Sequence, residues 1–212
     1  MTESSEREQR LKQIIELERR MFIEVRASSP SACQEHLRTF ATMRRMSHSV
    51  LSDEFLESFL DDLREAFTAK PSEGCCISPS LSEHANLVSS SPRRNFFVEK
   101  YARIEGQIPP LKHSPLIADI MQIELGWFLE VQRKYPTLLR SNEAFQAYEQ
   151  AELETYSDRS LQLLFCDVGA ALQAGRNLVE ERYENLSLML GFSSIAQMIA
   201  NSSPDSNGGC HV

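Results

Sequence analysis

Residues Leu51-Ser-Asp-Glu-Phe-Leu-Glu-Ser-Phe-Leu-Asp-Asp-Leu-Arg-Glu-Ala-Phe67 decide the fold class of this chain. Ser52 is a residue type that caps the amino ends of helices, and Asp53 and Glu54 follow it in a first turn where negative charge is favourable. Apolar residues then recur at helical spacing and form one broad apolar face. The stretch therefore predicts an amphipathic helix from about Asp53 to Ala69.

The end of this helix carries the pattern Asp-Asp-x-x-Glu at Asp61, Asp62 and Glu65. Asp61 and Glu65 are one turn apart and share a face, and their composition is typical of a solvated acidic stripe. Asp62 instead projects toward the apolar side, where a carboxylate must find a partner or lose its charge. The sequence leaves the partner of Asp62 open.

A second stretch, Tyr156-Ser-Asp-Arg-Ser-Leu-Gln-Leu-Leu-Phe-Cys-Asp-Val-Gly-Ala-Ala-Leu172, repeats the first. In it Asp167 matches Asp62, whereas Cys166 and Ala170 occupy the positions of Asp61 and Glu65. Further matches relate residues 17–25 to 123–131, 40–43 to 145–148 and 95–101 to 177–183. Because β-type alternation is absent as well, we expect an all-α protein of two tandem, pseudo-symmetric four-helix units packed as one domain.

The expected first unit comprises residues 8–70 and 93–108, and the second comprises residues 116–200. Residues 71–92 are rich in serine, without periodicity, and predict an inserted flexible loop. Residues 202–212 predict a disordered polar tail. Within the units, helices are expected over residues 6–25, from Ser31 with Gln34 in a capping box, from Arg93 to a point before Pro109, and over residues 195–199.

Composition limits the classes of protein that fit. The 212 residues carry a formal net charge of -8, so a nucleic-acid partner would require a local basic patch. No apolar run is long enough to span a bilayer, and the beginning of the chain has no apolar signal-peptide core, so we expect no membrane partner and a cytoplasmic protein. Five cysteines without a Cys-x-x-Cys pair argue against a disulfide framework or structural zinc.

Polar residues kept in both halves are expected to serve the fold, by binding helix ends and one another. These pairs are Glu18 and Glu124, Asp62 and Asp167, Asn95 and Asn177, Glu99 and Glu181, Lys100 and Arg182, and Tyr101 and Tyr183. A carboxylate-bridged metal pair is the alternative, although no Glu-x-x-His occurs and His48 is the histidine placed to join it.

Polar residues found in one half alone can serve a single site. They are Arg44, Arg45, His48, Asp61 and Glu65, opposite Glu149, Gln150, Leu153, Cys166 and Ala170. The simple interpretation of Arg44 is an ion pair with Glu18 or Asp62, and that of His48 is a polar turn residue. No nucleophile elbow or glycine-rich phosphate loop occurs.

The Asp61-Asp62-Leu63-Arg64-Glu65 segment resembles the fungal arginine-containing cyclodipeptide synthases. The wider pattern resembles the domain-of-unknown-function 4125 family over nearly the whole chain, at Cys33-Gln34, Leu51-Ser52, residues 95–103 and Tyr156-Ser157. This resemblance implies an enzyme of secondary-metabolite biosynthesis, without cofactor or metal, that joins arginine and a second amino acid from two aminoacyl-tRNAs into a diketopiperazine. A carboxylate cluster is suited to the guanidinium group of arginine.

The resemblance makes Asp61, Asp62 and Glu65 the candidate catalytic residues. Candidate substrate-binding residues are Glu18, Arg44, His48, Asn95, Glu99, Tyr101, Glu124, Glu181 and Tyr183, and candidate tRNA-binding residues are Arg93, Arg94, Lys100 and Arg103. The simple alternative for these cations is pairing with neighbouring glutamates. The alternatives to the synthase are a carboxylate-metal helical enzyme and a non-enzymatic helical module that binds a partner protein.

Overall fold

The computed structural model describes residues 3–25, 36–68, 94–109, 114–139 and 141–201. These form α1 (Glu3–Ile23), α3 (Leu37–His48), α4 (Asp53–Thr68), α6 (Phe96–Ile104), α7 (Pro115–Lys134), α8 (Asn142–Leu153), α9 (Asp158–Gln173), α10 (Leu178–Met189) and α11 (Ile195–Asn201). No strand occurs in these ranges, and none of their helices has the length and apolar content needed to cross a membrane. The all-α prediction is confirmed. The predicted cap at Ser31, the insertion and the polar tail lie outside the described residues.

Several of the described helices begin at a side-chain cap. Ser52, Asn95, Ser157 and Asn177 each accept a hydrogen bond from a backbone N–H in the first turn of α4, α6, α9 and α10. The extended backbone of Asn95 explains why α6 begins at Phe96, later than the predicted start at Arg93. The predicted cap of the central helix is confirmed.

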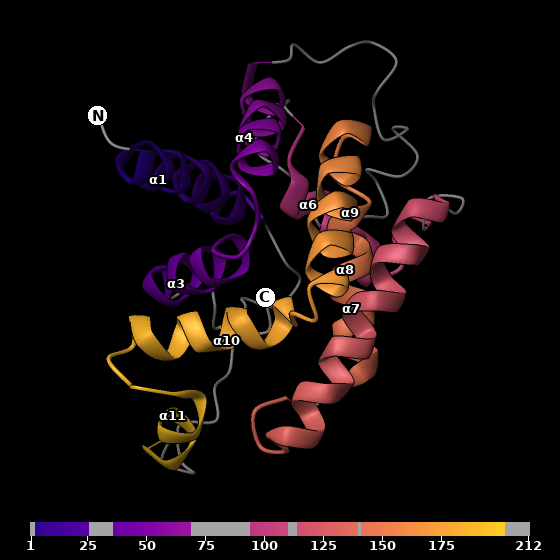
Figure 1. Ribbon diagram of the computed structural model, residues 1–212. Helices are drawn as coiled ribbons and strands as arrows, with labels where there is room; N and C mark the ends of the chain where they lie inside the picture. The colour runs from indigo at the N-terminus through magenta and orange to yellow at the C-terminus, as the bar shows by residue number, and fades with distance from the viewer. Residues whose placement is uncertain (1–2, 26–35, 69–93, 110–113, 140, 202–212) are drawn as a thin grey trace.

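The helices of the two halves pack across one another (Figure 1). Within each half, α1 packs on α3 and α4, and α7 packs on α8 and α9. Helix α6 packs on α8 of the second half, while α10 crosses to pack on α3 of the first. Because α4 also packs on α9, both halves contribute to the same interior.

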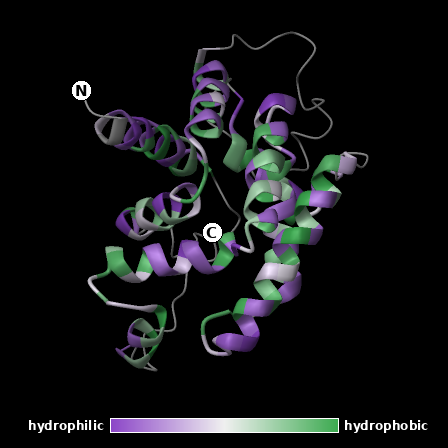
Figure 2. Ribbon diagram, viewed as in Figure 1, coloured by the Kyte–Doolittle hydropathy of each residue, from purple (hydrophilic) through white to green (hydrophobic). Residues whose placement is uncertain are grey.

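Aromatic rings fill matched places in this interior. Phe22 of α1 stacks on Phe40 of α3 with ring centroids 4.4 Å apart, and Phe128 of α7 stacks on Phe145 of α8 at the same distance. Figure 2 shows hydrophobic and hydrophilic bands alternating along these helices, as expected for helices that bury one face. The repeated positions therefore make repeated core contacts.

Candidate functional site

Glu18 is the first of several charged side chains buried between the halves. It is 1% exposed, and its Oε1 accepts a hydrogen bond of 2.6 Å from Nη2 of Arg44. Nε2 of His48 lies 3.1 Å from both carboxylate oxygens of Glu18 and 3.3 Å from Nη2 of Arg44. Burial by itself raises the pKa of Glu18, but Arg44 and His48 lower it below its ordinary value. The expected Glu18–Arg44 ion pair is confirmed, and His48 is a buried residue rather than a polar turn residue.

Arg44 also reaches the second half of the chain. Its Nη2 donates to Oε1 of Glu152 at 2.7 Å, and Nζ of Lys100 donates to Oε2 of the same carboxylate at 2.6 Å. The hydroxyl of Tyr156 donates to Oε1 at 3.0 Å. Burial alone raises the pKa of Glu152, but Arg44 and Lys100 hold it well below the ordinary range. Glu152 is therefore an ionised carboxylate with its acceptor sites occupied.

Glu124 has a separate counter-ion. Its side chain is fully buried, and Arg182 donates to its two oxygens at 2.7 and 2.8 Å. Burial lowers the pKa of Arg182, but Glu124 raises it above its ordinary value, so Arg182 stays charged. Glu18 and Glu124, which match in the repeat, are thus both neutralised by arginine, but from different helices.

A cavity of about 120 Å³ lies beside these ion pairs. By the same measure a single water needs only about 10–15 Å³. Helices α3, α6, α8 and α10 and the connection between α8 and α9 contribute the charged and polar lining residues, which are Arg44, Ser47, His48, Lys100, Tyr148, Glu149, Glu152, Tyr156, Arg182 and Tyr183. The cavity therefore lies between the two halves, has both charged and apolar walls, and has room for a small organic group.

Glu149 is the unusual group in this lining. No ion pair or hydrogen bond to it is formed within the described part of the chain, although its partly buried side chain faces the cavity. Burial, followed by the nearby carboxylate of Glu124, raises the pKa of Glu149 to about 7, and Arg182 opposes this rise. A carboxyl group with a pKa near neutrality can accept and return a proton at physiological pH.

The three predicted catalytic carboxylates do not meet in this cavity. Asp61 and Glu65 lie on the exposed face of α4, where Asp61 receives a hydrogen bond of 3.3 Å from Arg64. Asp62 turns the other way and accepts hydrogen bonds from the backbone N–H of Ser157 at 3.3 Å and from the hydroxyl of Ser160 at 2.6 Å. The partner of Asp62 is thus the amino end of α9, and the catalytic assignment of the three residues stays a prediction.

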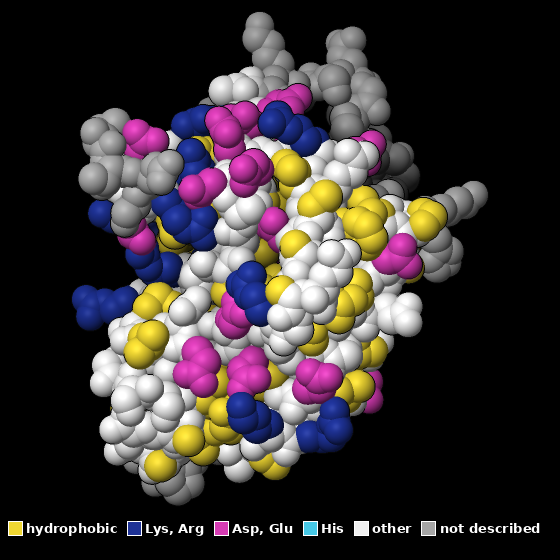
Figure 3. Space-filling model, in the orientation of Figure 1, with side chains coloured by type: hydrophobic (Ala, Val, Ile, Leu, Met, Phe, Trp, Pro, Cys, Tyr) yellow, Lys and Arg dark blue, Asp and Glu magenta, His cyan; other side chains and the backbone are white. Residues whose placement is uncertain are grey.

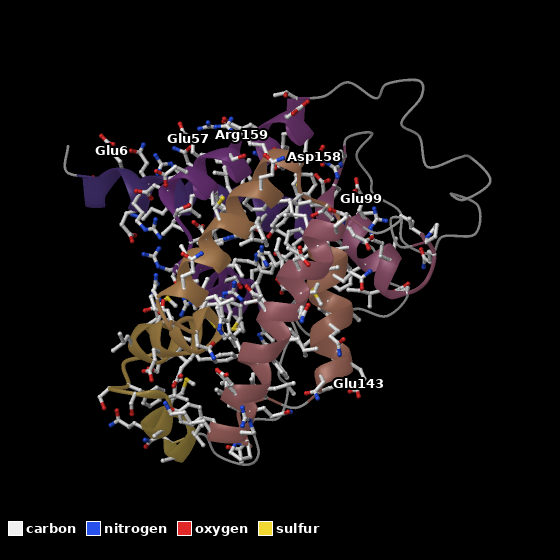
Figure 4. The ribbon with its side chains drawn as sticks, turned by 45° about the vertical axis from the view of Figure 1, so that its right-hand side comes forward. Glu6, Glu57, Glu99, Glu143, Asp158 and Arg159 are labelled. Carbon is white, nitrogen blue, oxygen red and sulfur yellow. The ribbon has the colours of Figure 1, made fainter. Side chains whose placement is uncertain are left out.

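Several predicted substrate-binding residues are held in local contacts. Asn95 donates to the backbone carbonyl of Met21 in addition to capping α6. Glu99 is paired with Arg94 and Glu181 with Arg176, in both cases through two hydrogen bonds, and Figure 4 shows Glu99 near the outside of the molecule. Tyr183 lines the cavity, whereas Tyr101 packs edge to face on Tyr148. Of the predicted set, Arg44, His48 and Tyr183 face the cavity, with Glu18 behind Arg44 and Glu124 behind Arg182.

The predicted tRNA-binding cations do not form one surface. Lys100 is 3% exposed and held by Glu152, so it is unavailable to an external phosphate in this conformation. Arg103 pairs with Glu154 at 3.0 Å, and Arg94 is exposed but paired with Glu99. Arg93 lies outside the described residues. On the face in Figure 3, basic and acidic side chains are intermingled.

Sequence reasoning gave no role to Glu149 or Glu152. Both lie on one face of α8, three residues apart, and Glu149 occupies the position that matches Arg44. The sequence could have drawn attention to Glu149 in one way: it is an acid at the repeat position where the first half has the cation Arg44. In the described ranges, no group of three or more His, Cys, Asp or Glu side chains is placed to hold a metal ion.

Comparison with known proteins gives a family and no activity. No curated protein matches the chain, and no solved structure does. A family model described as a protein of unknown function (DUF4125) matches residues 8–71 and 84–200, and the residues between these segments fall within the predicted insertion. The chain therefore belongs to the DUF4125 family.

Proposed function

We propose that this protein is an arginine-containing cyclodipeptide synthase that uses two aminoacyl-tRNAs as substrates, and that the chemistry takes place at the cavity between its halves. The observation that carries the proposal is Glu149, a cavity carboxyl group with no counter-ion among the described residues and a pKa raised to about 7 by burial. Formation of an amide from an aminoacyl ester requires an ammonium group to lose a proton. A base with a pKa near the working pH is suited to that step.

The reaction balances without an external energy source. The α-amine of one aminoacyl group attacks the ester carbonyl of the other, a C–N bond forms, and the C–O bond to the ribose breaks. The ammonium nitrogen loses two protons on the way to the amide: one is released to solvent, and the other passes to Glu149 and then to the ribose oxygen of the departing tRNA. A second, intramolecular attack of the same kind closes the six-membered ring and releases the second tRNA. Both esters are already activated, so alignment of the reacting groups and proton transfer suffice.

The roles implied for Asp61, Asp62 and Glu65 can be tested separately from that of Glu149. Asp61 and Glu65 are exposed on α4, where they are available to a substrate that approaches from solvent. Asp62 is engaged at the end of α9. In the proposed enzyme, Asp61 and Glu65 contact the arginyl substrate outside the cavity, while Asp62 maintains the junction between α4 and α9.

The decisive experiment is production in a bacterial host followed by mass spectrometry of the medium. The wild-type protein is expected to yield a diketopiperazine whose mass equals arginine plus a second residue. Glu149→Gln and Asp61→Asn should each lose the product while remaining folded. Glu143→Gln is the matched control, because Glu143 undergoes the same chemical change at an exposed position at the outer end of the same helix (Figure 4).

Two results would contradict the proposal. Folded wild-type protein that gives no new diketopiperazine would contradict the synthase function, and full product from Glu149→Gln would remove the assigned base. The tRNA partner has its own test, because binding of aminoacyl-tRNA through phosphate contacts should weaken as salt rises. Binding that does not change with salt would contradict recognition through Arg94 and the other basic residues.

A further inference from the structure

The surface where α1 meets α4 is covered by two arginine side chains. The guanidinium group of Arg20 on α1 lies over the ring of Phe67 on α4, 4.7 Å from its centroid. Nη2 of Arg64 on α4 donates a hydrogen bond of 2.8 Å to Oε1 of Gln13 on α1. Both contacts join the outer sides of the two helices, and the ring of Phe67 is partly buried.

The matching surface of the second half, where α7 meets α9, lacks both arginines. Gly126 of α7 occupies the repeat position of Arg20, and Gly169 of α9 occupies that of Arg64. Leu172, which matches the covered phenylalanine, is 50% exposed. The described chain therefore covers the outer surface of the first helix pair and leaves that of the second pair open.

The two glycines are not required by the packing of the described chain. A Cβ atom at Gly126 or Gly169 would meet no other part of the described structure within 4 Å, and neither residue has a positive φ. Glycine in the middle of a helix lowers its stability relative to alanine. Two such positions on one surface instead permit the close approach of a backbone from outside the described chain.

The middle of this surface carries little charge. Between Asp119 and Glu130 the charged residue of α7 is Glu124, which is fully buried, and after Arg159 that of α9 is Asp167, which binds the amino end of α4. Figure 3 shows hydrophobic side chains gathered over α9 and the adjoining part of α7. A chain with a net charge of -8 repels its own copies, and over this surface that repulsion is small.

The charges toward the two ends of α7 are complementary to a second copy of the same helix. Asp119, Gly126 and Arg133 recur every seven residues, so they lie along one line of the helix surface, about 10 Å apart. Two copies of α7 packed antiparallel, with Gly126 facing Gly126, would bring Asp119 of each copy opposite Arg133 of the other. Neither side chain forms an ion pair within the described part of the chain, and the exposed Leu129 lies beside this line.

We propose that the face formed by α7 and α9 binds the same face of a second copy of this chain, about a two-fold axis that passes between the two Gly126 residues. Each copy then covers the exposed Leu129 and Leu172 of the other, and two pairs of Asp119 with Arg133 fix the antiparallel direction. A face about 30 Å long and two helices wide buries on the order of 1,200 Å² in a pair, at the lower end for specific complexes. The expected assembly is a reversible dimer with a dissociation constant of about 1–100 µM.

Sedimentation velocity of the purified full-length protein, over concentrations of about 1–300 µM, measures this dimer. A reducing agent is present, because Cys166 is exposed on α9. Wild-type protein should change reversibly from monomer to dimer. Gly126→Arg introduces the residue found at the matched position of α1 and should raise the dissociation constant at least about tenfold, with unchanged helix content by circular dichroism. Gln9→Arg, which adds the same charge at an exposed position of α1, is the matched control and should dimerise as wild type does.

Charge reversal tests the antiparallel pairing. Asp119→Arg and Arg133→Asp should each weaken the dimer about tenfold at low salt, because like charges would then face each other. An equimolar mixture of the two variants should dimerise as wild type does, since the two introduced residues face each other and the two unchanged residues do as well.

Three results would overturn the proposal. Wild-type protein that stays monomeric over this range would show that a second copy does not occupy the face and that a different partner must be sought. Wild-type dimerisation by Gly126→Arg would place the contact elsewhere on the molecule. A mixture of the charge variants that is as weak as its components would exclude the antiparallel arrangement. None of these outcomes depends on the proposed synthase reaction, which is measured separately by product formation.

Discussion

Asp62 of α4 accepts hydrogen bonds at the amino end of α9, and Asp167 of α9 accepts one of 2.8 Å from the backbone N–H of Ser52 at the amino end of α4. Each helix thus supplies a carboxylate to the unpaired N–H groups and the positive dipole end of the other. The two aspartates occupy matched positions in the repeat, so the contact is reciprocal. It joins the two halves at their centre.

The first prediction concerns these aspartates. Asp62→Asn and Asp167→Asn should each lower the free energy of unfolding by about 1–2 kcal/mol, because a charged acceptor at a helix end becomes neutral. Urea denaturation measures the change. Asp61→Asn is the matched control, since its side chain is exposed and should change stability by less than about 0.5 kcal/mol. Equal destabilisation by all three would contradict the assignment.

A second prediction concerns Arg44, which forms ion pairs with two buried carboxylates, Glu18 and Glu152. Arg44→Met should destabilise the protein by about 3–5 kcal/mol, because Glu18 and Glu152 would stay buried with too few counter-ions. Chemical denaturation of the variant beside Arg45→Met tests this. Arg45 is the adjacent arginine with a partly exposed ion pair to Glu8, so its loss should cost less than about 1 kcal/mol. A loss of similar size in both variants would show that the burial of Arg44 is unimportant.

The capping asparagines provide a third prediction. Asn95 and Asn177 both accept from a first-turn N–H. Asn95 also donates to the carbonyl of Met21 in α1, and Asn177 donates to the carbonyl of Trp127 in α7. Replacing either asparagine with alanine should cost about 1–2 kcal/mol, because the cap is lost together with this link. Thermal or urea unfolding checks it. Asn201→Ala, at the exposed end of α11, should be nearly neutral, and a neutral Asn95→Ala would refute the role of the cap.

The fourth prediction is the pH dependence of stability due to Glu149. Its pKa is raised in the folded protein to about 7, so the folded state holds a proton that the unfolded chain has released between pH 4.5 and 7. The stabilisation that this bound proton gives to the folded state is fully present below about pH 4.5 and is lost as the pH rises through 7. We expect Glu149→Gln to be more stable than wild type at pH 8 by about 1–2 kcal/mol, allowing for screening by cavity water.

Urea denaturation at pH 5.5 and pH 8 measures this difference, with Glu143→Gln as the control. The advantage of Glu149→Gln over wild type should shrink at pH 5.5, where the wild-type carboxyl group is mostly protonated. An advantage that is independent of pH, or a variant less stable than wild type at pH 8, would show that Glu149 does not carry an uncompensated charge.

The internal repeat made part of the structure predictable. Asp62, Asp167, Asn95 and Asn177 were expected to bind helix ends because they occur in both halves, and the observed contacts confirm this. The pairing of Glu18 with Arg44 was also among the expected alternatives. Helix periodicity and capping are local properties, so a single sequence contains the information for them.

The role of Glu149 could not be predicted in the same way. Its sequence neighbours form an ordinary helix, and its pKa depends first on burial and then on Glu124 of α7 and Arg182 of α10. Spacing likewise placed Asp61 and Glu65 on one face of α4 correctly, but it could not show that this face is directed away from the cavity.

The sequence by itself determined the helices, their caps, the repeat and the set of polar residues that the fold must accommodate, because these depend on contacts within a few turns of chain. Tertiary structure alone decided how the buried charges are distributed. Arg44 and Glu152 are 108 residues apart, and Lys100 and Glu152 are 52 apart, yet both cations bind the same carboxylate. Ion pairing acts over a few ångströms of space and not along the chain, so the fold alone determines that Glu149 is the acid left without a counter-ion among the described residues.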